Sequence, residues 1–115
     1  MRINDFKLTE NFRLIEFQCP CCHTVLLNPL LVAKLQMLRD GVKQAIIINS
    51  GYRCAEHNKK VGGVLNSLHR IGQAADVRVP LAEQDKFCEL ALEHGFAKAI
   101  PYGARGFVHL QIGVD

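Results

Sequence analysis

The stretch Ser67–Asp76, S-L-H-R-I-G-Q-A-A-D, follows a loop rich in Gly and Asn and ends where a strand is expected to begin. Within it, His69 and Asp76 lie seven positions apart, with Gly72 between them. Near the C-terminus, F-V-H-L-Q adds a further candidate, His109. Two imidazoles and a carboxylate suit a catalytic zinc ion, because three protein ligands leave the fourth position for water or a substrate carbonyl. We therefore expect the rest of the chain to be the scaffold that brings these segments together.

Length and composition predict one globular domain. The chain has 115 residues, of which 49% are hydrophobic and 22% are charged, so residues 1–115 are expected to fold as a single domain. The net charge of +3 is small and the basic residues are scattered among acidic ones, which argues against nucleic-acid binding. No apolar run approaches the ~20 residues of a membrane helix, so we expect no membrane association.

The N-terminal stretch M-R-I-N-D-F-K-L-T-E is charged and lacks the apolar segment of a secretory signal. We expect a chain that begins natively at Met1, is made in the cytoplasm and works as a monomer. An action outside the cell would then require release by another factor.

The chain contains five cysteines, an odd number, and without a secretory signal reduced thiols are the default expectation. Three of them lie in C-P-C-C-H, where Cys19 and Cys22 have the spacing of half a zinc knuckle. Cys54 or His23 would be able to join them in a structural zinc site. A disulfide to Cys54 is the alternative in an oxidising compartment.

The hydrophobic pattern mixes helices with strands. Asn28 and Pro29 predict the start of a helix, with Leu31, Leu35, Leu38 and Val42 on its buried face and Gly41 near its end. Two further helices are expected in the ranges 54–61 and 81–95. Strands are expected at 45–50, 74–80 and 106–113, with a short one at 24–27 and a helical turn capped by Thr9 in the N-terminal arm. The predicted class is α+β, with a small, mainly antiparallel sheet and flanking helices.

Three separated motifs resemble one known family. S-G-Y-R-C-A-E-H-N-K-K-V-G-G, N-S-L-H-R-I-G-Q-A-A-D and F-V-H-L occur in the order seen in M15 peptidases, and the likeness spans roughly Phe12 to Ile112. This family contains zinc D-Ala-D-Ala carboxypeptidases and L-alanyl-D-glutamate endopeptidases, and it shares its fold with the Hedgehog signalling domain. The chain looks most like the short branch of the family found in phages and bacteria.

The resemblance implies functions for individual residues. It places zinc on His69, Asp76 and His109 and turns Arg53 toward the substrate, where its guanidinium would grip a carboxylate or polarise a carbonyl. It also implies that Ser67 and Tyr52 line the site. A loop serine equally often caps a turn, and a tyrosine beside a strand often serves packing, so both alternatives stay open.

The residues expected to supply the general base depart from the family pattern. Members supply a carboxylate as general base three residues before the last histidine or two after it, and here these positions hold Gly106 and Gln111. An amide cannot accept a proton as a carboxylate does, and general-base catalysis is typically worth ~10²–10⁴-fold in rate. Arg53 and Gln111 are the catalytic candidates, and Glu56, His57, Asp115 or another carboxylate brought in by folding would have to replace the missing base.

Three hypotheses follow. The first is a zinc metallopeptidase that hydrolyses peptide bonds in the stem peptides of peptidoglycan, as a D,D-carboxypeptidase or an endopeptidase, acting on the cell wall after release or as part of a phage particle. The second is a cell-wall-binding module that keeps zinc and has lost catalysis. The third is a structural component of a virion that uses the domain only as a fold.

Overall fold

A computed structural model of the chain describes residues 4–64 and 67–113. Within these ranges the helices are α1 (Pro29–Val42), α2 (Ala55–Lys60) and α3 (Gln84–Glu93), and the strands are β1 (Ile48–Ser50), β2 (Ala74–Arg78), β3 (Lys98–Pro101) and β4 (Phe107–Gln111). Short 3₁₀ turns lie at Leu14–Phe17 (η1), Leu68–Ile71 (η2), Leu81–Glu83 (η3) and Gly103–Arg105 (η4).

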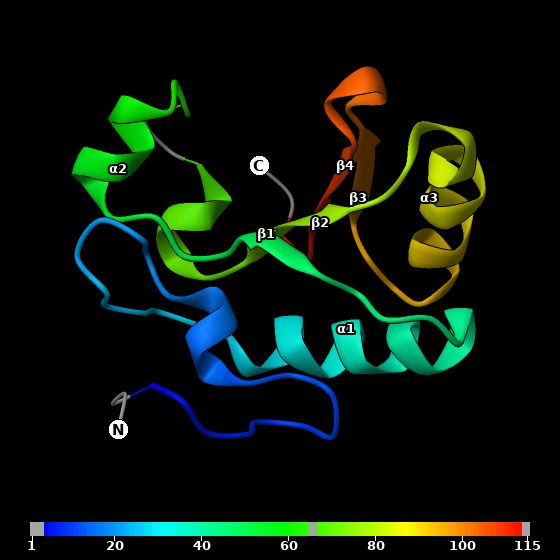
Figure 1. The fold of residues 1–115 in the computed structure, drawn as a ribbon, viewed down its shortest axis with the longest axis horizontal. Coiled ribbons are helices and arrows are strands. Elements are labelled where there is room, and N and C mark those ends of the chain that lie inside the picture. Colours follow the sequence, from blue (N-terminus) through cyan, green and yellow to red (C-terminus); the bar gives the residue numbers. More distant parts are fainter. Residues whose placement is uncertain (1–3, 65–66, 114–115) are drawn as a thin grey trace.

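The strands form one antiparallel sheet in the order β1-β2-β4-β3. In Figure 1, α1 runs along one side of the sheet, α3 flanks it beside β3, and α2 lies at the opposite end of the molecule, beyond β1. The expected α+β class with a small antiparallel sheet and flanking helices is confirmed.

Side chains alternate between the two faces of the sheet along each strand, so one face can form the core and the other can carry the site residues. Ala75 and Val77 on β2 and Val108 and Leu110 on β4 turn toward the helices and belong to the hydrophobic core. The predicted stripe of α1 packs against them, with Leu31, Leu35 and Leu38 fully buried and Val42 partly buried. Asp76 and His109, at the alternate positions, therefore lie on the other face.

Several local predictions are wrong. Residues 24–27 form no strand. Thr9 does not cap the helical turn of the N-terminal arm, because the N-cap of η1 is Arg13 and the Thr9 hydroxyl donates to Gln36 Oε1 at 2.7 Å. The first helix passes Gly41, ends at Val42 and is capped by Lys43 in the left-handed conformation. Asn28 is the N-cap as expected, since its Oδ1 accepts from the Leu30 N–H at 2.9 Å.

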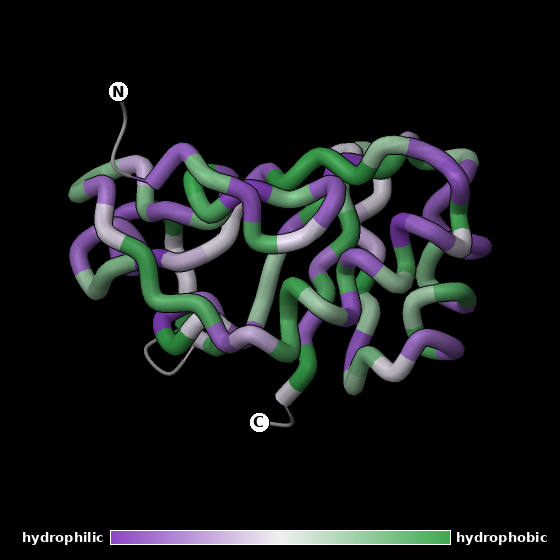
Figure 2. Tube along the Cα trace, turned by 90° about the horizontal axis from the view of Figure 1, so that it is seen from below, coloured by the Kyte–Doolittle hydropathy of each residue, from purple (hydrophilic) through white to green (hydrophobic). Residues whose placement is uncertain are grey.

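Apolar stretches along the chain are short and alternate with hydrophilic ones, as Figure 2 shows by colour. None of the described helices combines the length and the apolar content that a membrane span requires.

Candidate metal centre

His69 is presented from η2, immediately before β2. The Ser67 side chain caps this turn by accepting from the His69 backbone N–H at 3.2 Å, and Gly72 closes it with φ of 71°. The turn is also tied to the first motif, because the Arg53 N–H donates to the His69 carbonyl at 3.1 Å. His69 is almost completely buried, with 2% of its surface exposed.

The hydrogen bonds of His69 decide which ring nitrogen carries its proton. Nδ1 lies 2.8 Å from the Gly51 carbonyl oxygen, which can only accept, so Nδ1 is assigned as the protonated nitrogen. Nε2 is buried and has no hydrogen-bond partner among the described residues. It lies 3.3 Å from Asp76 Oδ1, so a lone pair faces a carboxylate oxygen. A cation between the two atoms would satisfy both.

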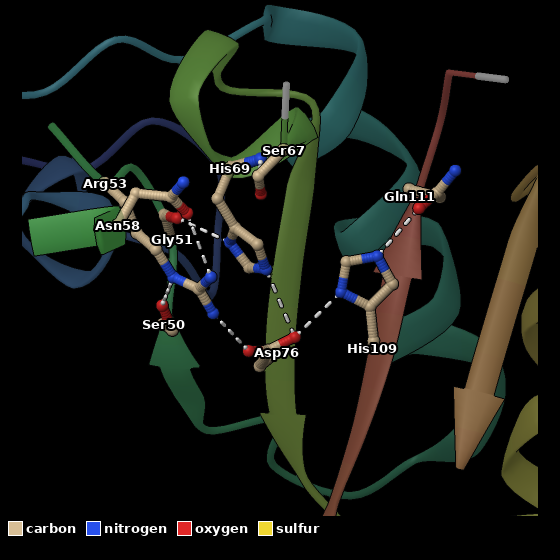
Figure 3. Close-up of polar contacts among 9 residues, drawn as sticks. All are labelled: Ser50, Gly51, Arg53, Asn58, Ser67, His69, Asp76, His109 and Gln111. Carbon is tan, nitrogen blue, oxygen red and sulfur yellow. Dashed lines mark hydrogen bonds and ion pairs between the residues drawn. The ribbon is translucent and has the colours of Figure 1, made fainter. Parts of the chain in front are cut away.

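Asp76 and His109 are direct partners across the neighbouring strands β2 and β4. His109 Nδ1 lies 3.0 Å from Asp76 Oδ1, and Figure 3 shows His69 and His109 both turned toward this same carboxylate oxygen. The two rings lie 5.2 Å apart between centroids. The sheet register therefore brings Asp76 to His109, and η2 adds His69.

Gln111 fixes the other nitrogen of His109. Its Nε2 donates to the Gly113 carbonyl at 2.9 Å, which turns its Oε1 toward His109 Nε2 at 2.8 Å. An amide oxygen only accepts, so His109 Nε2 donates this bond. The Nδ1 of His109 is then the atom left to face Asp76, either with a proton or as the ligand of a cation.

The charges of the cluster favour ionised groups. Burial raises the pKa of Asp76, but its close contacts with the His109 and His69 side chains outweigh burial and hold that pKa well below its usual range. Burial lowers the pKa of His109, and the proximity of Arg53 adds to this. Hydrogen bonds to Asp76 and Gln111 outweigh both and raise that pKa above its usual value. In the metal-free cluster these shifts favour the carboxylate form of Asp76 and the protonated form of His109.

Arg53 contacts the cluster from the side of β1. Its Nη2 donates to Asp76 Oδ2 at 3.1 Å, Nε donates to Ser50 Oγ at 3.2 Å, and Nη1 lies 3.4 Å from Asn58 Oδ1. These bonds use three of the five N–H donors of a guanidinium. They turn Oδ1 of Asp76, the oxygen that Arg53 does not bind, toward the two histidines (Figure 3).

The remaining predicted site residues lie around this cluster with different contacts. Ser67 caps η2, as one of its two interpretations expected. Tyr52 is half-buried, its backbone N–H donates to the Phe17 carbonyl at 2.8 Å, and within the described ranges no hydrogen bond links its hydroxyl to the cluster. The Gly51 carbonyl and Asn58, which sequence reasoning missed, are both part of the arrangement.

His69, Asp76 and His109 each offer one ligand atom, and these atoms all lie within 4.8 Å of one another. The residues fit a metal ion, because His69 Nε2 is a buried lone pair without another partner and Asp76 supplies a compensating charge. A nitrogen–oxygen–nitrogen set with both histidines oriented by second hydrogen bonds is the arrangement of metal-dependent hydrolases.

Comparison with known proteins identifies a family within the class of metal-dependent hydrolases. The chain belongs to the Peptidase M15 family, whose sequence profile matches residues 9–111, and the expected family is thereby confirmed. It is similar to a protein of Streptomyces albus G named zinc D-Ala-D-Ala carboxypeptidase, with 38% identity over 77 residues. The similar region covers 64% of this chain and 29% of the length of that relative.

Proposed function

We propose that this chain is a zinc-dependent peptidase that hydrolyses peptide bonds in the stem peptides of peptidoglycan. The convergence of His69, Asp76 and His109, with ligand atoms within 4.8 Å of one another, is the observation that carries the proposal. Membership of the M15 family and similarity to a protein named zinc D-Ala-D-Ala carboxypeptidase support the ion and the substrate class. The bond cleaved would be that of a D,D-carboxypeptidase or of an endopeptidase.

In this proposal the ion is held by His69 Nε2, Asp76 Oδ1 and His109 Nδ1. Bound zinc would supply Lewis-acid chemistry, lowering the pKa of water and polarising the scissile carbonyl. The Gly51 carbonyl and Gln111 hold the two imidazoles in the tautomers that such ligation needs. Gln111 is a catalytic candidate from its sequence position, but we assign it to positioning, because both ends of its amide are engaged by His109 and Gly113.

Arg53 would have two functions. It orients Asp76 by binding Oδ2, and its remaining N–H donors are suited to a substrate carboxylate or carbonyl. A pocket beside it supports this second function, since Arg53, Ser50, His57 and Glu16 are among its lining residues. A peptide chain in this pocket would meet Arg53 and Gly51, the two lining residues that also contact the metal cluster. Ser67 would act on substrate only through the turn that holds His69.

A second candidate function is binding without cleavage. Within residues 4–64 and 67–113, Asp76 is the carboxylate that contacts His69 and His109, and Gln111 bonds His109 where family members carry an acid. Glu56 is exposed in the first turn of α2, His57 lines the pocket, and Asp115 lies outside the described residues. A cell-wall-binding module with bound zinc would fit this arrangement.

We further propose that residues 1–115 act as one peptidase domain and as a monomer. Its place of action would be the cell wall, reached after release from the cell or as part of a phage particle.

The deciding experiment is digestion of purified peptidoglycan with the zinc-loaded protein, with products identified by mass spectrometry. New stem-peptide fragments that disappear in His69→Ala are expected and would name the bond. Serial loss of terminal D-alanine would indicate a carboxypeptidase, and internal fragments an endopeptidase. If the protein binds zinc stoichiometrically and sediments with peptidoglycan but releases no stem-peptide fragments, the binding module is the better hypothesis.

A further inference from the structure

A second cluster of metal-ligating side chains lies between the N-terminal arm and the start of α2. The Sγ atoms of Cys19, Cys21 and Cys54 all lie within 4.8 Å of one another. Cys54 Sγ is 3.6 Å from Cys19 Sγ and 3.9 Å from Cys21 Sγ. Cys54 is far from the other two in sequence, so the fold brings these thiols together.

The backbone around Cys19 is shaped as a tight loop. The Cys19 N–H donates to the Thr24 carbonyl and the His23 N–H donates back to the Cys19 carbonyl, both at 2.8 Å. His23 takes the left-handed conformation with φ of 59°, an uncommon conformation for a residue other than glycine. This loop turns both Cys19 and Cys21 toward Cys54.

Backbone donors converge on the Cys19 sulfur. Burial raises the pKa of this thiol, but the N–H groups of Cys54, Cys22 and Cys21 outweigh burial and lower it to about 7. Such donors stabilise a thiolate, and the thiolate is the form that binds metals. The Cys19 site is therefore prepared for negative charge although Cys19 itself is fully buried.

A second thiolate beside Cys19 is disfavoured without a cation. The His57 N–H lowers the pKa of Cys54, but burial and the neighbouring thiols Cys19, Cys21 and Cys22 raise it to about 11. A bound cation would relieve this repulsion, and thiolate sets select zinc and other soft ions. Zn–S bonds of ~2.3 Å in a tetrahedron place sulfurs about 3.8 Å apart, close to the two separations around Cys54.

We propose that Cys19, Cys21 and Cys54 bind a second metal ion, zinc or a similar thiolate-binding divalent cation, separate from the His69–Asp76–His109 cluster. Cys22 lies outside this cluster, because its Sγ contacts Thr24 Oγ1 at 2.8 Å. A disulfide between Cys19 and Cys54 would use two of the three clustered sulfurs and leave Cys21 without a function. A three-thiolate site uses all three, and its fourth position would be open to another ligand. Cys88, on α3 against the core, also lies outside the cluster.

An ion bound by these cysteines would connect the N-terminal arm to the segment that carries Arg53. Cys54 is both the N-cap of α2 and the residue next to Arg53. The same two segments already meet where the Tyr52 N–H donates to the Phe17 carbonyl. A tetrahedral thiolate site commonly supplies folding free energy in small domains, so this ion would be structural and would hold Arg53 near Asp76.

Cobalt(II) substitution separates the two sites, because only sulfur ligands give intense thiolate-to-cobalt charge-transfer absorption in the near ultraviolet. The full chain, reduced and free of metal, is titrated anaerobically with cobalt. We expect two cobalt ions per chain and the charge-transfer band from one of them. His69→Ala should bind one ion and keep the band, whereas Cys54→Ser should bind one ion and lose it.

Cys88→Ser is the matched control, since it removes a thiol outside the cluster and should leave both the stoichiometry and the band unchanged. Native mass spectrometry of the unaltered protein with zinc provides a measurement that requires no variant to fold, and two ions are expected. One ion per chain in the reduced protein, without a charge-transfer band, would overturn the proposal. So would a band that persists in both Cys19→Ser and Cys54→Ser.

Discussion

Gln111 illustrates how a single side chain sets the chemistry of its neighbour. Its amide donates to the Gly113 carbonyl and accepts from His109, so its orientation is determined at both ends. The histidine is left with Nδ1 facing Asp76. This contact explains why an amide can occupy a position where the family pattern has an acid: it orients the imidazole without adding a negative charge.

Replacing Gln111 should therefore change zinc binding. Gln111→Ala removes the acceptor for His109 Nε2, and loss of such an outer partner is expected to weaken zinc binding by ~10–100-fold. Competition with a fluorescent chelator measures this directly. Gln111→Glu keeps an acceptor oxygen and should bind zinc at least as tightly as the original protein.

The exposed Gln44 provides the control, because Gln44→Ala should leave zinc affinity unchanged. Equal zinc affinity in Gln111→Ala and Gln44→Ala would show that Gln111 does not position His109 for zinc binding.

The pair of Asp76 and His109 predicts the pH dependence of the metal-free protein. The raised pKa of His109 gives stability that is fully present below its unfolded value of ~6.5 and is lost as pH rises through the folded pKa. The lowered pKa of Asp76 gives stability that is present above ~3.9 and is lost as pH falls. The pair should thus stabilise the metal-free fold most between about pH 4 and 6.5.

Thermal unfolding after chelation, recorded from pH 4 to 8, tests this window. Asp76→Asn removes the charge that His109 faces and should flatten the decline above pH 6.5. The zinc-loaded protein should show the opposite slope there, because ligation requires a neutral imidazole. A metal-free protein that becomes more stable from pH 6 to 8 would contradict the assignment.

At the scale of elements, α1 shows which helix signals are local. Asn28 caps its start and Pro29 occupies its first turn, as the sequence indicates. Its end is different, because Gly41 stays inside the helix and Lys43 closes it with φ of 56°. Gly41 is needed for close packing, since an added Cβ would lie 2.8 Å from His94 Nε2. Gly41 thus marks a close contact with His94, the C-cap of α3, and not the end of α1.

The left-handed Lys43 predicts a stabilising substitution. A side chain in this conformation costs about 1–2 kcal/mol relative to glycine, so Lys43→Gly should raise the free energy of unfolding by roughly 1 kcal/mol once the added flexibility is deducted. Chemical denaturation measures the change. Gln44→Gly, one residue on, is also exposed and should be neutral or destabilising; a loss of stability in both variants would refute the capping argument.

At the scale of the whole molecule, the candidate metal cluster and Arg53 connect four elements. Arg53 follows β1, His69 lies in η2, and Asp76 and His109 come from the paired strands β2 and β4. Binding of an ion to the folded state alone stabilises it by mass action, by about 2.7 kcal/mol at 100 times the dissociation constant. Metal should therefore act on global unfolding and not only on one loop.

Removal of metal should lower the unfolding temperature of the whole chain. Differential scanning calorimetry of the zinc-loaded and chelated protein is expected to show one cooperative transition that shifts downward on chelation. His69→Ala should show a smaller shift, because one ligand of the cluster is missing. An identical shift in His69→Ala and in the unaltered protein would indicate that zinc stabilises through other residues.

The linear order of residues was sufficient for much of the architecture. Apolar spacing in α1, alternation along β4 and the cap at Asn28 depend on neighbours within a few positions, and each agrees with the structure. The direct pairing of Asp76 with His109 did not follow from the sequence, because strand order and register depend on contacts between distant segments. The expected strand at 24–27 failed because apolar residues there pack against the core without a pairing partner.

Local patterns and motif order were enough to predict the α+β class, the family and the residue types that gather at the metal cluster. The contacts of individual polar groups required the folded structure. Gly51 sets the tautomer of His69 across 18 positions, and Cys54 meets Cys19 across 35 positions. Gln111 and His109 are only 2 positions apart, but the direction of their hydrogen bond depends on how Gly113 orients the Gln111 amide. Such contacts arise from the folded arrangement of side chains and backbone, so spacing along the chain does not encode them.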